Sequence, residues 1–259
     1  MRLQYYVVDA FVGAGLKGNP AGVCVLNKWL PDERLQEIAS ENNLSETAFL
    51  VKAGNAFDLR WFTPAVEVDL CGHATLASGC VVFNYLHPAL ERVQFSTKSS
   101  ILTVSKDDEF LAMDFPSRPP VLATDSPDIV NGLGKEPLEV HASRDLLCLF
   151  KSEEEVRSLT PNTEILSRVE NLGVIATAPG NNSDFVSRFF APRAGIPEDP
   201  VTGSAHCTLT PFWSQRLGKT ELHALQVSAR GGEIYCTNYG ERVNLRGRAR
   251  VFMEGEIIL

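Results

Sequence analysis

Two segments of the chain, about half its length apart, follow the same order of residue types. In each, a β-rich run ends at a proline, an aspartate follows, and a glycine then opens a strongly apolar stretch. The first copy occupies residues 61–74 and the second residues 189–205. Self-similarity at this spacing predicts a duplicated domain and a pseudo-twofold arrangement, with a cleft between the halves. The length of 259 residues agrees with this, because it corresponds to roughly two domains of ordinary size.

The glycines of the two copies, Gly72 and Gly203, stand where the predicted helices begin. The first four amides of a helix have no partner within it, and the helix dipole adds about half a positive charge at that end. A glycine there lets a ligand reach the backbone without meeting a Cβ atom. Two such helix starts facing one another predict a binding site for a carboxylate.

The hydrophobic pattern predicts an α+β protein. Apolar residues at helical spacing indicate helices over 32–42, 72–86 and 203–217, and a charged helix begins near Ser152. The segment 72–86 is apolar on nearly all sides, so we expect it to be buried. Most strands lie close together in sequence, so antiparallel pairing is expected. The predicted strands cover residues 4–11, 23–26, 47–52, 58–62, 92–97, 100–106, 109–115, 138–142, 145–150, 173–178 and 184–190, with four more within 222–258.

A polar, proline-rich stretch from Pro116 to Pro127 forms the natural linker between the halves. It predicts a first domain of residues 1–116 and a second of residues 117–259. The final strand is the one element that could pair back with the first domain.

Composition excludes several classes of function. The net charge is −8 and no run of basic residues could neutralise consecutive phosphates, so nucleic acid is not an expected partner. No apolar run approaches the ~18 residues that span a bilayer, and the first residues lack a signal-peptide pattern. We therefore expect a cytoplasmic protein without a membrane partner. The six cysteines have no C-x-x-C spacing, which favours reduced thiols over a disulfide framework or a zinc ribbon.

Five short motifs, in order along nearly the whole chain, resemble the PhzF-like (phenazine biosynthesis) isomerase family. They are Gly18-Asn19-Pro20, Asn43-Leu44-Ser45-Glu46-Thr47, Phe62-Thr63-Pro64, Cys71-Gly72-His73-Ala74-Thr75 and Asp199-Pro200-Val201-Thr202-Gly203-Ser204-Ala205. The resemblance implies the diaminopimelate epimerase-like fold, with two pseudo-symmetric β-barrel-like domains, each around a central α-helix, and a homodimer. The implied activity is that of an isomerase that moves a proton on a small carboxylate substrate, with a glutamate as the base and no metal or organic cofactor.

The resemblance also assigns roles to individual residues. Proton transfer is assigned to Glu46 in the cleft, with His73 and Asp199 positioning substrate or assisting proton movement. A second set is assigned to substrate binding: Asn19, Gly72, Gly203 and Ser204.

The residue before each glycine departs from the pattern of the related two-thiol epimerases. The first copy carries Cys71, whereas the second carries Thr202. A threonine hydroxyl is far too weak a base to replace a thiolate, so racemisation by two opposed thiols is not available. Cys71 itself is open to two readings, a reactive thiol at a helix start or an inert buried one.

Two alternatives stand beside the isomerase. One is a metal site built from Cys71, His73, Asp199, His206 and Cys207. It is disfavoured because adjacent helical residues such as His206 and Cys207 point about 100° apart. The other is a non-catalytic ligand-binding or scaffolding protein that retains the fold.

Overall fold

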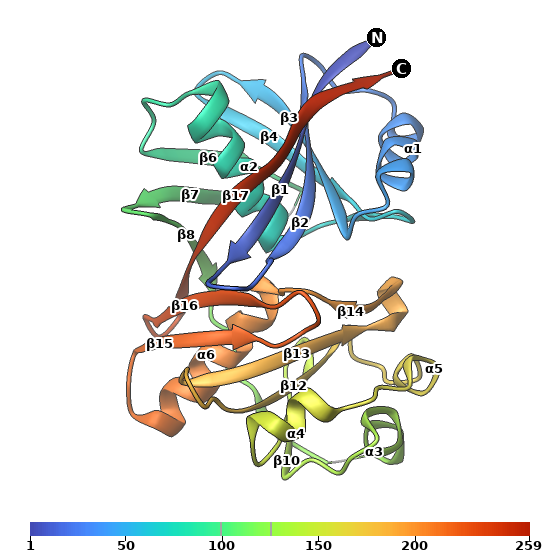
Figure 1. The fold of residues 1–259 in the computed structure, drawn as a ribbon, viewed down its shortest axis with the longest axis vertical. Helices are drawn as coiled ribbons and strands as arrows, with labels where there is room; N and C mark the ends of the chain where they lie inside the picture. The colour runs from blue at the N-terminus through green and yellow to red at the C-terminus, as the bar shows by residue number, and fades with distance from the viewer. Residues whose placement is uncertain (99, 125) are drawn as a thin grey trace. The chain divides into compact units, whose positions relative to one another are not determined.

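The computed structural model describes residues 1–98, 100–124 and 126–259, and these form two compact units (Figure 1). Unit 1 contains Met1–Asp114 and Arg246–Leu259, and unit 2 contains Phe115–Leu245. The chain therefore leaves unit 1 two residues before the predicted boundary at Pro116, and its last segment belongs to unit 1. Among the described residues, no helix is long and apolar enough to cross a membrane.

Unit 1 is a closed β-barrel around one helix. Its barrel strands pair in the order β1–β2–β3–β4–β6–β7–β8–β17 and back to β1. These strands are β1 (Arg2–Val12), β2 (Asn19–Leu26), β3 (Glu46–Ala53), β4 (Ala56–Phe62), β6 (Arg92–Ser96), β7 (Ile101–Asp107), β8 (Phe110–Pro116) and β17 (Arg242–Ile258). Short β5 (Glu67–Val68) pairs with the end of β4.

The central helix of unit 1 is α2 (Gly72–Val81), and all of its residues are buried, as its apolar sequence predicts. It continues as a π-helical turn, Val82–Leu86. A Cβ atom added at Gly79 would lie 2.7 Å from Val104 Cγ1 of β7, so the helix packs tightly against the barrel wall there. Helix α1 (Asp32–Asn42) lies outside the barrel and buries Leu35, Ile38 and Ala39. It ends where Asn43 adopts a left-handed conformation, with φ of 48°.

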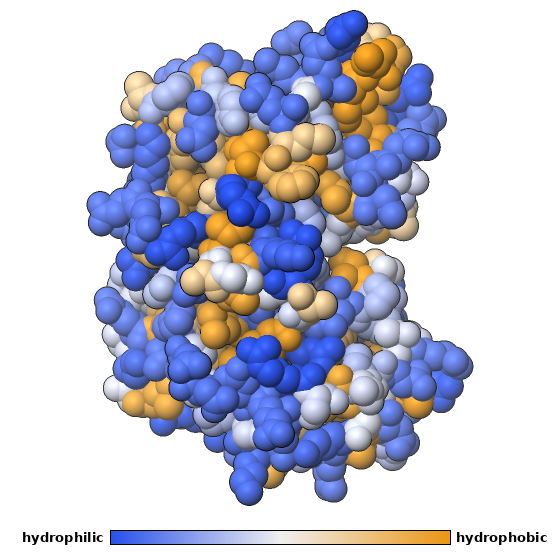
Figure 2. All heavy atoms as spheres, viewed as in Figure 1, coloured by the Kyte–Doolittle hydropathy of each residue, from blue (hydrophilic) through white to orange (hydrophobic). Residues whose placement is uncertain are grey.

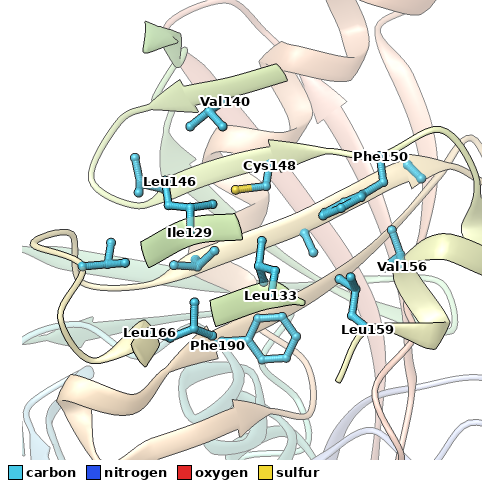
Figure 3. Close-up of a cluster of buried hydrophobic side chains, with 14 of the residues drawn as sticks. Ile129, Leu133, Val140, Leu146, Cys148, Phe150, Val156, Leu159, Leu166 and Phe190 are labelled. Atoms are coloured by element: carbon cyan, nitrogen blue, oxygen red, sulfur yellow. The ribbon is translucent and has the colours of Figure 1, made fainter. Parts of the chain in front are cut away.

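Unit 2 repeats this plan around α6 (Gly203–Leu217). Its strands pair in the order β9–β10–β11–β12–β13–β15–β16. They are β9 (Val121–Ala123), β10 (Glu139–Ala142), β11 (Leu146–Leu149), β12 (Val174–Pro179), β13 (Phe185–Ala191), β15 (Glu221–Gln226) and β16 (Gly232–Asn238), with β14 (Ile196–Asp199) paired to the end of β13. The short helices α3 (Pro127–Leu133), α4 (Glu153–Ser158) and α5 (Thr163–Leu166) contribute Leu133, Val156 and Leu166 to a buried apolar cluster (Figure 3).

The two units share their order of strand pairing. In unit 1, β2 runs parallel to β3, β3 antiparallel to β4, and β4 parallel to β6. In unit 2, β11, β12, β13 and β15 follow the same sequence of parallel, antiparallel and parallel pairs. In both, a strand ending before a proline leads through a short hairpin to the central helix. The sequence repeat is thus a repeat of topology.

Several local predictions were wrong. Among the described residues most strand pairs are antiparallel, as predicted, but β2–β3, β4–β6, β11–β12 and β13–β15 are parallel. In these pairs other elements intervene and return the chain in the same direction, as α1 does between β2 and β3. The predicted linker contains strand β9, and β2 begins at Asn19, four residues before the predicted strand 23–26. Residues 222–258 form three strands rather than four, since β17 is continuous.

Hydrophilic residues cover most of the face drawn in Figure 2, with smaller hydrophobic groups between them.

Candidate active site

Unit 1 brings Glu46, His73 and Cys71 together at the start of α2. Glu46 is the first residue of β3, Cys71 is the N-cap of α2, and His73 is the second residue of that helix. His73 Nε2 lies 3.2 Å from Glu46 Oε2, and His73 Nδ1 lies 3.5 Å from Cys71 Sγ. The three residues are only 3–8% exposed. The imidazole therefore stands between a thiol and a carboxylate.

Burial determines the charge of the His73 ring. Removal from water lowers the pKa of His73 to about 3, so the ring is neutral at physiological pH. A neutral imidazole has one nitrogen that donates and one that accepts a hydrogen bond. It contacts Glu46 as a polar neighbour rather than as a cation.

The same three residues offer metal-ligand atoms, all within 4.8 Å of one another. Their geometry does not fit one ion, because Cys71 approaches Nδ1 whereas Glu46 approaches Nε2, and a single ion takes one nitrogen of the ring. His206, the other histidine of the metal hypothesis, has its Nδ1 2.8 Å from the Thr202 carbonyl oxygen. Among the described residues, neither His206 nor Cys207 belongs to a cluster of metal-ligand type.

Asn19 and Gly72 also lie in unit 1. Asn19 is fully buried as the first residue of β2, and two residues further on, Ala21 is the partner of Glu46 in the parallel β2–β3 pair. The preceding Gly18 has φ of +70°, and a Cβ atom there would lie 2.3 Å from the Ala10 carbonyl oxygen. Glycine is thus required for the chain to enter β2 at this point.

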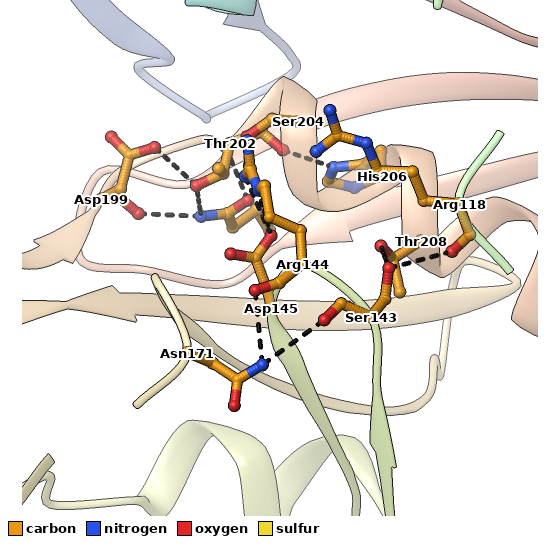
Figure 4. Close-up of polar contacts among 11 residues, drawn as sticks. Arg118, Ser143, Arg144, Asp145, Asn171, Asp199, Thr202, Ser204, His206 and Thr208 are labelled. Atoms are coloured by element: carbon orange, nitrogen blue, oxygen red, sulfur yellow. Dashed lines mark hydrogen bonds and ion pairs between the residues drawn. The ribbon is translucent and has the colours of Figure 1, made fainter. Parts of the chain in front are cut away.

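Unit 2 holds the remaining predicted residues at the start of α6 (Figure 4). The Thr202 hydroxyl donates to Asp199 Oδ2 at 2.5 Å. The fully buried Gln226 accepts from the Thr202 amide at 2.8 Å and donates to the Asp199 carbonyl oxygen at 2.8 Å. This network fixes the turn between β14 and α6 and orients the Asp199 carboxylate.

Ser204, the second residue of α6, is held by an arginine. Arg144 Nη2 donates to Ser204 Oγ at 2.9 Å and to Asp145 Oδ2 at 2.9 Å (Figure 4). Asp145 is completely buried, so it anchors the guanidinium from behind. A hydroxyl, a guanidinium and helix amides at one end of α6 form a site suited to an anion.

Sequence reasoning missed Gln226 and Arg144. Neither belongs to a motif, and each reaches the start of α6 from a strand or turn far away in the sequence.

The predicted residues fall into two groups, with Asn19, Glu46, Gly72 and His73 in unit 1 and Asp199, Gly203 and Ser204 in unit 2. Their assignment to one site stays a prediction.

Comparison with known proteins identifies close relatives. The family model for PhzC-PhzF, phenazine biosynthesis-like protein, matches residues 8–255. An uncharacterized isomerase of Pseudomonas aeruginosa is 50% identical over 260 residues, which cover 100% of both chains. The crystal structure of a PhzF family phenazine biosynthesis protein from Enterococcus faecalis has a TM-score of 0.96 at 48% identity and 100% coverage of both chains. A hydroxyproline epimerase from Agrobacterium vitis shares the fold, with a TM-score of 0.64 at 10% identity, covering 99% of this chain and 91% of that one. The predicted family and fold class are confirmed.

Proposed function

The chain belongs to the PhzC-PhzF family, and on that premise we propose that it is a cofactor-independent isomerase that moves a proton on a small carboxylate substrate. Glu46 is the general base that takes the proton from carbon and returns it elsewhere. The observation that carries this proposal is the buried contact between Glu46 and the neutral His73.

The surroundings of Glu46 suit a base that works at neutral pH. A carboxylate in water has a pKa of about 4.3 and removes a proton from carbon poorly. Glu46 is only 8% exposed, and removal from water makes a carboxylate more basic. The neutral His73 ring offers a hydrogen-bond donor without adding a full positive charge that would suppress this basicity.

The substrate carboxylate is assigned to the amides at Gly72 and Gly203 and to the Ser204 hydroxyl, and Asn19 is assigned to substrate binding as well. Both helices begin with amides that have no intrahelical partner, and both carry glycine at that point. Asp199, oriented by Thr202, is assigned a role in positioning the substrate or moving its proton. The active protein is proposed to be a homodimer, which light scattering after size-exclusion chromatography tests.

The central experiment is the Glu46→Gln variant, which keeps the shape of the side chain and removes the basic oxygen. A screen of small carboxylates in deuterated water first identifies one that the wild type converts, with solvent deuterium in the product. Glu46→Gln should then lower kcat by about 10²- to 10⁴-fold, the range of general-base catalysis. Glu41→Gln, at an exposed position near the end of α1, is the matched control.

The affinity for product separates chemistry from binding. The proposed anchors are untouched by the Glu46→Gln change, so the Kd for product should change little. Full turnover in Glu46→Gln would refute Glu46 as the base. Binding of carboxylates without any conversion by the wild type would favour a ligand-binding protein that retains the fold.

A further inference from the structure

The Cys71 thiol, the His73 ring and the Glu46 carboxylate form a row within unit 1. The thiol lies 3.5 Å from Nδ1 on one side of the ring, and the carboxylate lies 3.2 Å from Nε2 on the other. This order resembles the arrangement in which a histidine activates a thiol nucleophile. It also suits a different role, in which the thiol acts on the histidine.

The charge of the ring decides between these roles. Activation of the thiol requires its proton to move to His73, but burial lowers the pKa of His73 to about 3, far below the ~8.5 of a free thiol. The thiol therefore keeps its proton. Cys71 is also only 5% exposed, which leaves its sulfur little access to an electrophile.

A protonated thiol fits only one arrangement of hydrogen bonds around the ring. An ionised carboxylate can only accept hydrogen bonds, so the ring nitrogen that faces Glu46, Nε2, is the one expected to carry the proton. Nδ1 is then an acceptor, and the S–H group of Cys71 is a donor within reach of it. A single tautomer of the neutral ring thus suits both neighbours, although the 3.2 Å contact between Nε2 and Oε2 lacks the alignment of a hydrogen bond.

We infer that Cys71 is a positioning residue, whose thiol donates to His73 Nδ1 and thereby keeps the ring proton on His73 Nε2, the nitrogen that lies 3.2 Å from Glu46 Oε2. Its catalytic consequence rests on the proposed function, because a proton kept on Nε2 lies beside the carboxylate that we propose as the base. The hydrogen bond and the tautomer do not rest on it, since both are measurable without a substrate.

The test is ¹⁵N NMR of histidine-labelled protein at neutral pH, with the His73 signals assigned by their loss in His73→Gln. The wild type should carry the proton on Nε2, with Nδ1 shifted by an accepted hydrogen bond. Cys71→Ala and Cys71→Val should return Nδ1 to the position of a free acceptor or transfer the proton to it. Cys71→Ser keeps a donor and should preserve the wild-type pattern. Cys80→Ala, a buried cysteine on the same helix whose sulfur contacts Asn84, is the control.

Turnover provides a second readout. Cys71→Ala should lower kcat by about 2- to 10-fold with KM unchanged, the factor expected from one ordinary hydrogen bond, and Cys71→Ser should restore it. A wild-type proton on Nδ1, or His73 signals unchanged in both Cys71→Ala and Cys71→Val, would overturn the inference. A kcat loss in Cys71→Ala as large as that of Glu46→Gln would overturn it as well, because the thiol would then belong to the chemistry itself.

Discussion

Acid should destabilise this protein through two buried neutral histidines, well before most carboxylates titrate. Burial lowers the pKa of His73 to about 3 and that of His206 to about 4, whereas an unfolded histidine titrates near 6.5. Between these values the unfolded chain binds protons that the folded protein does not bind. Unfolding therefore takes up protons, and the free energy of unfolding falls as the pH drops below about 6.5.

The size of the effect follows from the same shifts. Between its folded and unfolded pKa values, each histidine lowers the free energy of unfolding by about 1.4 kcal/mol for each pH unit of acidification. The two histidines together give a slope of about 2.5 kcal/mol per pH unit between pH 6 and pH 5. From pH 7 to pH 4 the loss reaches about 3 kcal/mol for each histidine. That sum is comparable to the whole stability of many domains, so unfolding in mild acid is expected.

Urea denaturation followed by tryptophan fluorescence, at half-unit steps from pH 7 to pH 5, measures the slope. His73→Gln and His206→Gln should each remove about half of it. A free energy of unfolding that stays flat over this range would refute the reasoning. His73 would then be protonated in the folded protein, and its neutral role beside Glu46 would fail with it.

Two further predictions concern packing and buried hydrogen bonds. Gly79→Ala should lower the free energy of unfolding by about 1–3 kcal/mol, because the new Cβ would lie 2.7 Å from Val104 Cγ1 inside the barrel. Thermal unfolding measures this, and Gly255→Ala, where a Cβ meets no atom within 4 Å, should be nearly neutral. Gln226→Leu should cost about 1–3 kcal/mol for each buried group that loses its partner, beginning with the Thr202 amide. A Gln226→Leu variant with wild-type stability in urea would show that this network contributes nothing to the fold.

The sequence alone determined the parts of this protein that depend on neighbouring residues. Helical spacing of apolar residues placed α1 from near Asp32 to about Asn42 and α6 from Gly203 to about Leu217, close to the bounds that the structure shows. The all-apolar segment beginning at Gly72 gave the buried helix α2. The duplicated order of proline and glycine predicted the repeated topology, and the motifs around Glu46 and Gly203 predicted the family. A single sequence is enough to show these signals, because helix propensity, burial and backbone freedom depend on patterns over a few neighbouring residues.

Only the tertiary structure decided how distant segments meet. No local pattern distinguishes a parallel from an antiparallel partner, so the pairing of β2 with β3 had to come from the path of the chain through α1. The family resemblance assigned Glu46 and His73 to one site, but the contact between them, and the neutral charge of His73, arise from the burial of the α2 start beside β3. Gln226 carries no sequence signal at all, because one buried glutamine looks like any other until β15 brings it to Thr202. A side chain's pKa and its hydrogen-bond partners depend on what surrounds it in space, and that is set by the packing of the whole unit.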